Sequence, residues 1–123
     1  MILKSEVEVK KWLRQIPVLK KELELKIEFY TEIAADFKKL DEQSFEGYKK
    51  KINELKCRID ILLAEVDRLF DMLDDTERLV LTAKYIKAIR WDFIEFHVFY
   101  SRRQAIRIHN EAIKKLVGQE VKI

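Results

Sequence analysis

The longest regular pattern in the chain lies between residues 48 and 73, where apolar side chains recur at alternating spacings of four and three. Such a seam, sustained for more than three heptads, predicts a long helix whose apolar stripe another helix must cover. The preceding segment carries a weaker version of the pattern, from Leu23 to Phe37. The main seam consists of Tyr48, Ile52, Leu55, Ile59, Leu62, Val66, Leu69 and Leu73.

The boundaries of these two helices follow from short local signals. Ser5 and Glu8 have capping-box spacing, which predicts a helix start near residue 5. Pro17 costs about 3 kcal/mol inside a helix, so we expect a kink or a break near residues 15–16. The stretch "DEQSFEG", residues 41–47, is the best candidate linker. Because this linker is short, the two helices are expected to form an antiparallel hairpin.

A two-helix hairpin buries only one stripe and leaves a thin core. Leu25, Leu63 and Phe70 lie beside the seams and widen the apolar face. We therefore expect residues 1–73 to pack against a third element, preferentially a second copy of the chain, and to act as an oligomerisation region. Cys57 falls opposite the seam, so an exposed and inert thiol is expected there.

Composition supports an all-α fold. Charged residues make up 38% of the chain and hydrophobic residues 48%, with two glycines and one proline. Neither a signal-peptide run nor an apolar stretch of about 18 residues is present, which argues against a membrane protein. The single cysteine excludes a disulfide framework. These features predict a soluble cytoplasmic protein.

Charge is unevenly distributed along the chain. From residue 76 onward there are ten basic and five acidic residues, whereas residues 1–75 hold fifteen basic and seventeen acidic residues. The last third is therefore a positive module on a nearly neutral body. This asymmetry favours a polyanionic partner.

The positive module, residues 74–123, is predicted to form three helices. Asp74 and Glu77 have capping-box spacing and predict a helix start. A short helix over 91–98 and the turn "FYS", residues 99–101, follow. The first helix is expected to place Leu79, Ala83 and Ile86 on one apolar face.

The last helix, residues 101–116, begins at the capping box of Ser101 and Gln104. Its first two residues are then Arg102 and Arg103, each costing about 0.3–1 kcal/mol at the positive end of the helix dipole. A short helix, a tight turn and a longer helix with a basic outer face form the DNA-binding helix-turn-helix arrangement. The expected buried face is Ala105, Ile108, Ala112 and Leu116, and the outer face is Arg103, Ile106, Arg107, Asn110 and Lys114.

Residues 77–116 also resemble a known family of helix-turn-helix modules. The residues that carry the resemblance are "KYI" at 84–86, Trp91, Ile94, "YS" at 100–101, Gln104, "RIH" at 107–109 and Ala112. They resemble sigma-factor region 4, and more closely a group of small regulators encoded by phages and prophages of Gram-positive bacteria. In that group a coiled-coil-like helical part precedes the module, as it does here.

The chain departs from the family pattern at three positions. Ala88 and Phe99 stand where the family favours glycine, and Glu95 stands where it favours alanine. Glycine in such turns supplies positive φ, which is costly for a bulky side chain. We therefore expect a wider turn, or a Glu95 that points outward and pairs with an arginine.

The resemblance implies a transcriptional regulator that inserts the N-terminal part of helix 101–116 into the major groove of duplex DNA. Arg102, Arg103, Ile106 and Arg107 match the side that contacts bases and backbone. Two guanidinium groups at a helix start suit phosphate or guanine binding, although isolated charge runs are commonly just solvated. The full candidate set is Arg102, Arg103, Gln104, Ile106, Arg107, Asn110, Lys114 and Lys115, with Ser101 as the cap.

The remaining notable residues are interpreted as structural. Trp91, Ile94 and Val98 are expected to face the module core, and Phe93, Phe96 and Tyr100 to pack on the hairpin or on another subunit. His97 and His109 lack partners at metal-ligand spacing, so no metal or cofactor is expected. His109 is expected to pack beside Ile108 or to contact phosphate.

No glycine-rich phosphate loop or nucleophile motif is present, which argues against an enzyme. Two alternatives remain beside the DNA-binding regulator. One is a coiled-coil adaptor whose basic end binds RNA polymerase, a sigma factor or another protein. RNA binding is the weaker alternative, since the aromatic platforms of common RNA modules are absent.

Overall fold

The structure is a computed structural model that describes residues 1–35 and 42–122. The described chain is mostly helical and contains no β-strand, which confirms the all-α class. The long helices are α1 (Glu6–Ala35) and α2 (Glu42–Phe70). The C-terminal part contains α3 (Asp75–Leu81), a π-helical turn η2 (Thr82–Ile86), a 3₁₀-helix η3 (Trp91–Phe96) and α4 (Arg102–Leu116).

The three helix starts marked by capping pairs are confirmed. In each pair the first side chain accepts a hydrogen bond from the backbone N–H three residues later, which satisfies one of the free donors of the first turn. The pairs are Ser5 with Glu8, Asp74 with Glu77, and Ser101 with Gln104.

A break at Pro17 is not observed, because α1 runs continuously through it. The buried residues of α1 lie on both sides of the proline and belong to one hydrophobic core. Burying a large apolar side chain contributes about 1.5–3 kcal/mol, so a few of them offset the cost of an interior proline. The residues concerned are Val9, Trp12, Leu13, Ile16 and Leu19.

The predicted linker over 41–47 is also wrong, because residues 42–47 already belong to α2. Aromatic contacts explain this early start. The rings of Tyr30 and Phe45 lie 4.7 Å apart, and those of Phe29 and Tyr48 lie 5.5 Å apart. These pairs hold the first turns of α2 on α1. The predicted positions Phe37 and Asp41 lie outside the described residues.

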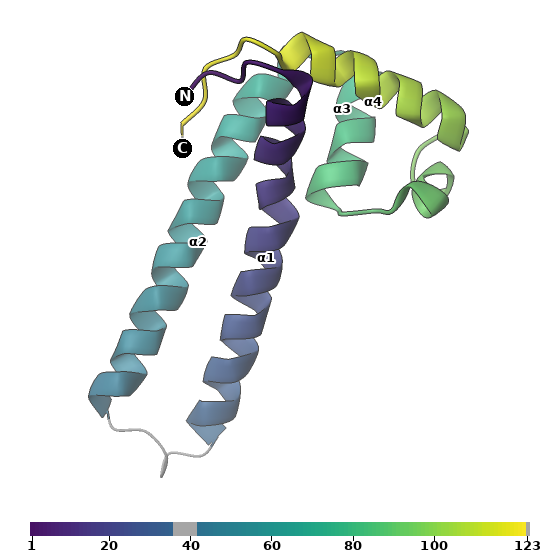
Figure 1. The fold of residues 1–123 in the computed structure, drawn as a ribbon. Coiled ribbons are helices and arrows are strands. Elements are labelled where there is room, and N and C mark those ends of the chain that lie inside the picture. The colour runs from purple at the N-terminus through teal and green to yellow at the C-terminus, as the bar shows by residue number, and fades with distance from the viewer. Residues whose placement is uncertain (36–41, 123) are drawn as a thin grey trace.

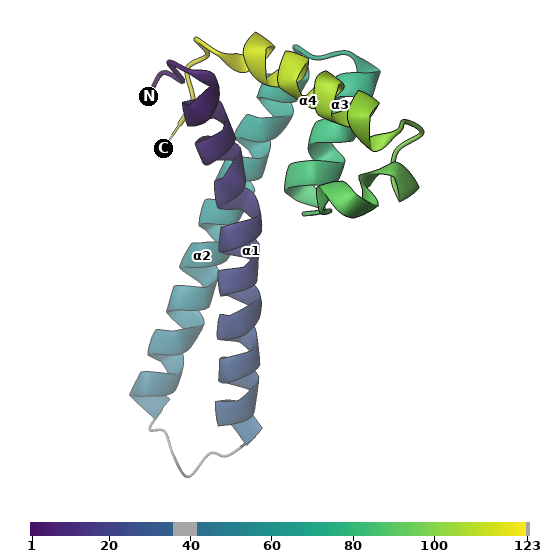
Figure 2. The same cartoon turned by 45° about the vertical axis from the view of Figure 1, so that its right-hand side comes forward.

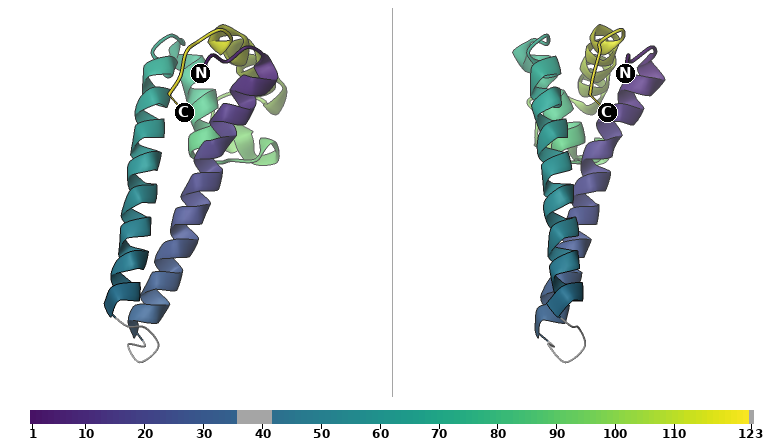
Figure 3. Two further views of the ribbon diagram at one scale, coloured as in Figure 1. Left: turned by 60° about the vertical axis from the view of Figure 1, so that its left-hand side comes forward. Right: turned by 90° about the vertical axis from the view of Figure 1, so that its left-hand side faces the viewer.

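The seam of α2 is buried as its spacing predicts. Every member from Ile52 to Leu73 is less than a tenth exposed, and Tyr48 is half-buried. Cys57, opposite the seam, is exposed as expected. Figure 1 shows α1 and α2 side by side and running in opposite directions. Figure 3 shows that they diverge toward the end that carries both chain termini.

The third element against which this helix pair packs is the chain's own C-terminal part. From α1, Figures 1 and 2 place α3 and α4 on the side away from most of α2, with α4 crossing the open end of the pair. One core cluster joins all these elements. It includes Trp12 and Ile16 of α1, Val66 and Leu69 of α2, Leu81 of α3, and Ile113 and Leu116 of α4.

The two chain termini are paired at this open end, a feature that the sequence does not signal. The Leu3 N–H donates to Gln119 O at 2.9 Å, and the Gly118 N–H donates to Leu3 O at 2.6 Å. Val121 N–H donates to Met1 O at 2.8 Å. Leu3 and Val121 are both buried in the main core. Gly118, with φ of 88°, turns the chain after α4 toward the N-terminus.

The two glycines offer a matched stability test, because a Cβ would meet nothing within 4 Å at either position. We expect Gly118→Ala to destabilise the protein by about 1–2 kcal/mol, since alanine is strained at positive φ. Gly47→Ala, inside α2, should instead stabilise it by about 0.5–1 kcal/mol. Urea denaturation measures both changes. Equal shifts of the same sign would contradict this account of Gly118.

Candidate nucleic-acid interface

Helix α4 is rigidly anchored on its inner face. Ala105, Ala112, Ile113 and Leu116 are completely buried, and Ile113 and Leu116 reach the core shared with α1 and α2. The predicted inner face needs one correction, because Ile108 is only half-buried and His109 is buried in its place.

His109 is held between Tyr85 and Trp91. The Tyr85 hydroxyl lies 2.6 Å from His109 Nε2, and Asn110 Oδ1 lies 3.0 Å from Nδ1. Burial lowers the pKa of His109 below its usual value of 6.5 and raises the pKa of Tyr85 to about 12. The neutral imidazole therefore donates through Nδ1 to Asn110 and accepts from the Tyr85 hydroxyl through Nε2. This buried arrangement makes His109 a packing residue rather than a phosphate ligand.

Tyr85 lies in the π-helical turn η2, four residues after the buried Leu81 of α3. Over residues 82–86 the buried side chains are Ala83 and Tyr85, and Lys84 is half-buried. Leu79, predicted on the apolar face, is 37% exposed, because α3 buries Val80 and Leu81 instead.

The two arginines at the start of α4 have different surroundings. Arg102 Nη1 lies 2.9 Å from Asp92 Oδ1, and both side chains are exposed. A surface pair contributes about 0–1 kcal/mol, similar in size to the cost of a cation at a helix N-terminus. Arg103 makes no ion pair within the described chain. Its unfavourable position is therefore not compensated by an ion pair in the described part of the chain.

The candidate residues divide into two groups. Within the first, Gln104 is used in the cap, Arg102 pairs with Asp92, and Lys115 Nζ lies 2.6 Å from Glu77 Oε1. The second group forms one outer face of α4 that is exposed except for the half-buried Ile106. We call it the α4 outer face; its members are Arg103, Ile106, Arg107, Asn110 and Lys114.

The turn before α4 adopts a shape that the family resemblance only partly anticipates. Ala88 has φ of 55°, so it does occupy the left-handed region where the family favours glycine. Phe99 does not have positive φ and is 96% exposed. Glu95 is exposed, as expected, but it has no arginine partner in the described chain.

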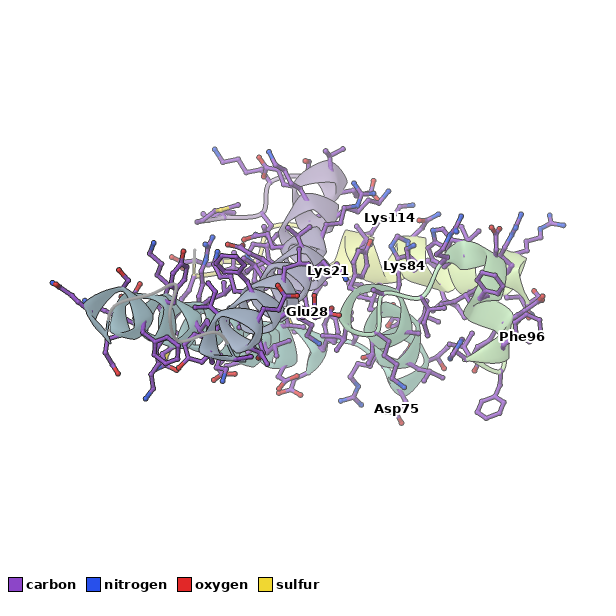
Figure 4. The ribbon with its side chains drawn as sticks, turned by 90° about the horizontal axis from the view of Figure 1, so that it is seen from below. Lys21, Glu28, Asp75, Lys84, Phe96 and Lys114 are labelled. Atoms are coloured by element: carbon purple, nitrogen blue, oxygen red, sulfur yellow. The ribbon has the colours of Figure 1, made fainter. Side chains whose placement is uncertain are left out.

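The second aromatic stripe does not pack on the hairpin. Phe93 is 53% exposed and Phe96 is 76% exposed, and Figure 4 shows Phe96 pointing away from α1. Ile94 and Val98 belong to a small buried core, while these rings stay outside. Tyr100 is half-buried, with its hydroxyl 3.4 Å from Thr76 Oγ1.

Other site types find no support in residues 1–35 and 42–122. That part of the chain holds no group of three or more histidine, cysteine, aspartate or glutamate residues that could hold a metal ion. None of its helices has the length and apolarity needed to cross a membrane. The chain matches no known family model, and no curated protein or solved structure shows significant similarity to it.

Lys114 and Lys115 are adjacent but should respond differently to substitution. Glu77 is 4% exposed, and its carboxylate pairs with Lys115, its one cationic partner in the described chain. Lys114 is exposed and unpaired there. We expect Lys115→Met to cost about 1–3 kcal/mol, because it leaves a buried carboxylate without its charged donor. Lys114→Met should change stability by no more than about 0.5 kcal/mol. Thermal unfolding of both variants tests this; equal stabilities would contradict a structural role for Lys115.

Proposed function

We propose that this protein is a sequence-specific duplex-DNA-binding transcriptional regulator, encoded by a phage or prophage, that reads the major groove with α4. The observation that carries the proposal is the α4 outer face. It presents Arg103, Arg107, Asn110 and Lys114 on a helix whose opposite side is buried except for the half-buried Ile108. An exposed helix of this kind fits the width of the major groove.

The surroundings of α4 support a helix-turn-helix interpretation. A separate small core, formed by Val80, Ala83, Ile94, Val98 and Ala105, ties α3, η2 and η3 to α4. Arg102, Arg103 and Gln104, in the first turn of α4, stay exposed in this arrangement. A recognition helix contacts base edges with its N-terminal residues. The resemblance to sigma-region-4-like regulators is consistent with it.

Each side chain of the outer face has a suitable chemistry. The guanidinium groups of Arg103 and Arg107 can form bidentate contacts with guanine or bind phosphate. Asn110 can pair with adenine, although its Oδ1 already accepts from His109. Lys114, at the other end of α4, is placed for a phosphate contact.

Substitutions at Arg103 and Ser101 are expected to affect DNA binding and protein stability differently. We expect Arg103→Ala to leave the melting temperature unchanged or slightly raised, because it removes an uncompensated cation from the helix start. The same change should weaken operator binding by about 1–3 kcal/mol. Ser101→Ala should instead cost about 1 kcal/mol of stability by removing the cap.

The operator is first selected from a random duplex pool. Titration then gives the operator affinity of the parent and of both variants, and thermal unfolding gives their melting temperatures. Binding by the parent should weaken steeply with salt, with a slope of about −0.9 per phosphate contact. Loss of stability in Arg103→Ala with unchanged DNA binding would make Arg103 structural. No salt-dependent duplex binding by the parent would refute the proposed function.

The exposed aromatic rings favour one second candidate, a non-enzymatic adaptor that binds RNA polymerase, a sigma factor or another protein. Phe93, Phe96 and Phe99 lie within seven residues of one another, and all three rings are exposed. Reading the major groove does not require exposed aromatic rings, whereas a protein partner could cover them. An adaptor would retain its protein partner at high salt and would bind no duplex. Replacing Phe96 and Phe99 with serine should then abolish partner capture.

We further propose that the protein is a homodimer or higher homo-oligomer joined through α1 and α2. Leu25 and Phe29 line a groove of about 370 Å³ together with Tyr48 and Ile52, and Leu25 is 53% exposed. A second groove of about 630 Å³, with Leu19, Ile61 and Leu62 in its lining, follows α2. A two-fold dimer would present two copies of α4 to related half-sites.

Light scattering combined with size-exclusion chromatography tests this assembly. We expect the parent at micromolar concentration to elute as a dimer or larger species. Leu25→Glu should shift it toward monomer while keeping its helical content, because Leu25 is already largely exposed. Leu79→Glu, an exposed site on α3, is the matched control and should not change the mass. A monomeric parent would contradict the proposal.

A further inference from the structure

Helix α1 contributes cations to a cluster beside α4. Helix α1 packs on η2 and α4 through one core, in which Leu13, next to Arg14, joins Tyr85 and Ile113. The positive charges of Lys10 and Arg14 reach His109 from this helix, and that of Arg14 also reaches Tyr85 and Lys84. Lys84 lies with Nζ 4.9 Å from the centre of the Trp91 ring. Burial lowers the pKa of Lys84, and the positive charges of Arg14 and Arg90 lower it further. We call Lys10, Arg14, Lys84 and Arg90 the junction cluster, since they surround the junction of α1, η2 and α4.

The junction cluster is not neutralised within the described chain. Every neighbouring charge that acts on Lys84, Tyr85 and His109 is positive. None of the four cations forms an ion pair with a described carboxylate. By contrast, Arg102 and Lys115 on α4 both have acidic partners. Four unpaired cations around one junction repel each other, so an anion from outside would stabilise them.

The cluster also continues the α4 outer face. Asn110, on that face, is bonded to His109, which the charges of Lys10, Arg14 and Lys84 reach. Figure 4 shows Lys84 and Lys114 on the side of the module next to α1, far from Phe96. A helix of about 10–12 Å diameter fills a groove about 12 Å wide, so the elements beside it meet the phosphate walls.

We infer that Lys10 and Arg14 of α1, together with Lys84 and Arg90, bind the phosphate backbone of the duplex along the groove that α4 enters. The inference rests on the proposed DNA-binding function and extends its interface to the helical pair. Part of the DNA affinity then comes from α1, and the position of α1 against α4 fixes the register of the module on the backbone.

The test compares two double variants of the full-length chain. Lys10→Gln with Arg14→Gln removes two cations of the junction cluster. Lys56→Gln with Arg58→Gln removes one exposed lysine and one exposed arginine from α2, which Figures 1 and 4 place beyond α1 from the module. Each protein is titrated against the selected operator and a mixed-sequence duplex over a range of salt concentrations, with melting temperature and mass as checks on folding and assembly.

We expect the junction variant to weaken binding to both duplexes by the same factor, since phosphate contacts carry no sequence information. Its salt slope should shrink by about 0.9 for each phosphate that the variant no longer neutralises, or about 1.8 for the pair. The α2 variant should keep the parental slope. If the parent binds DNA and the junction variant has the same affinity and salt slope as the α2 variant, the inference is wrong while the proposed function stands. If the parent does not bind DNA, the proposed function itself is refuted.

Discussion

The fold depends on the coverage of one apolar seam by two different partners. The seam of α2 is longer than α1 alone covers, because the two helices diverge where Val66 and Leu69 are buried. Ile113 and Leu116 of α4 occupy this open end together with Trp12 of α1. The hydrophobic effect therefore fixes not only the helical pair but also the position of α4 against it. Paired chain termini close the same end.

This shared core has a consequence for the proposed DNA interface. Because α4 packs on α1 through buried residues, the segment of α1 that carries Lys10 and Arg14 is held against the C-terminal part of the chain. A module on a flexible tether would not fix this relation. The neutral pair of Tyr85 and His109 lies at the same junction and fills it without adding charge to the surrounding cations. Tyr85 and His109 thus fill the space between the elements while the nearby cations remain the charged groups of the junction.

The charged residues of the C-terminal part fall into two groups, those with an ion-pair partner and those without one in the described chain. Asp92 and Glu77 pair with Arg102 and Lys115, which ties the start and end of α4 to η3 and α3. Arg103, Arg107 and Lys114 have no such partner in the described chain. A count of basic residues does not distinguish these groups. The proposed DNA interface therefore contains fewer residues of α4 than the sequence predicts. It also includes the junction cluster, with cations of α1 that the sequence does not predict.

Features that depend on local spacing are predictable from the sequence. The α2 seam, the three capping pairs and the exposure of Cys57 follow from periodicity and from hydrogen bonds between residues a turn apart. Features that depend on distant partners appear only in the folded molecule. Pro17 is tolerated inside α1 because of packing, and Tyr85 is buried against His109, which lies 24 residues later on α4. Lys10 and Arg14 reach the module only because α1 and α4 share a core, and no spacing along the chain encodes that contact.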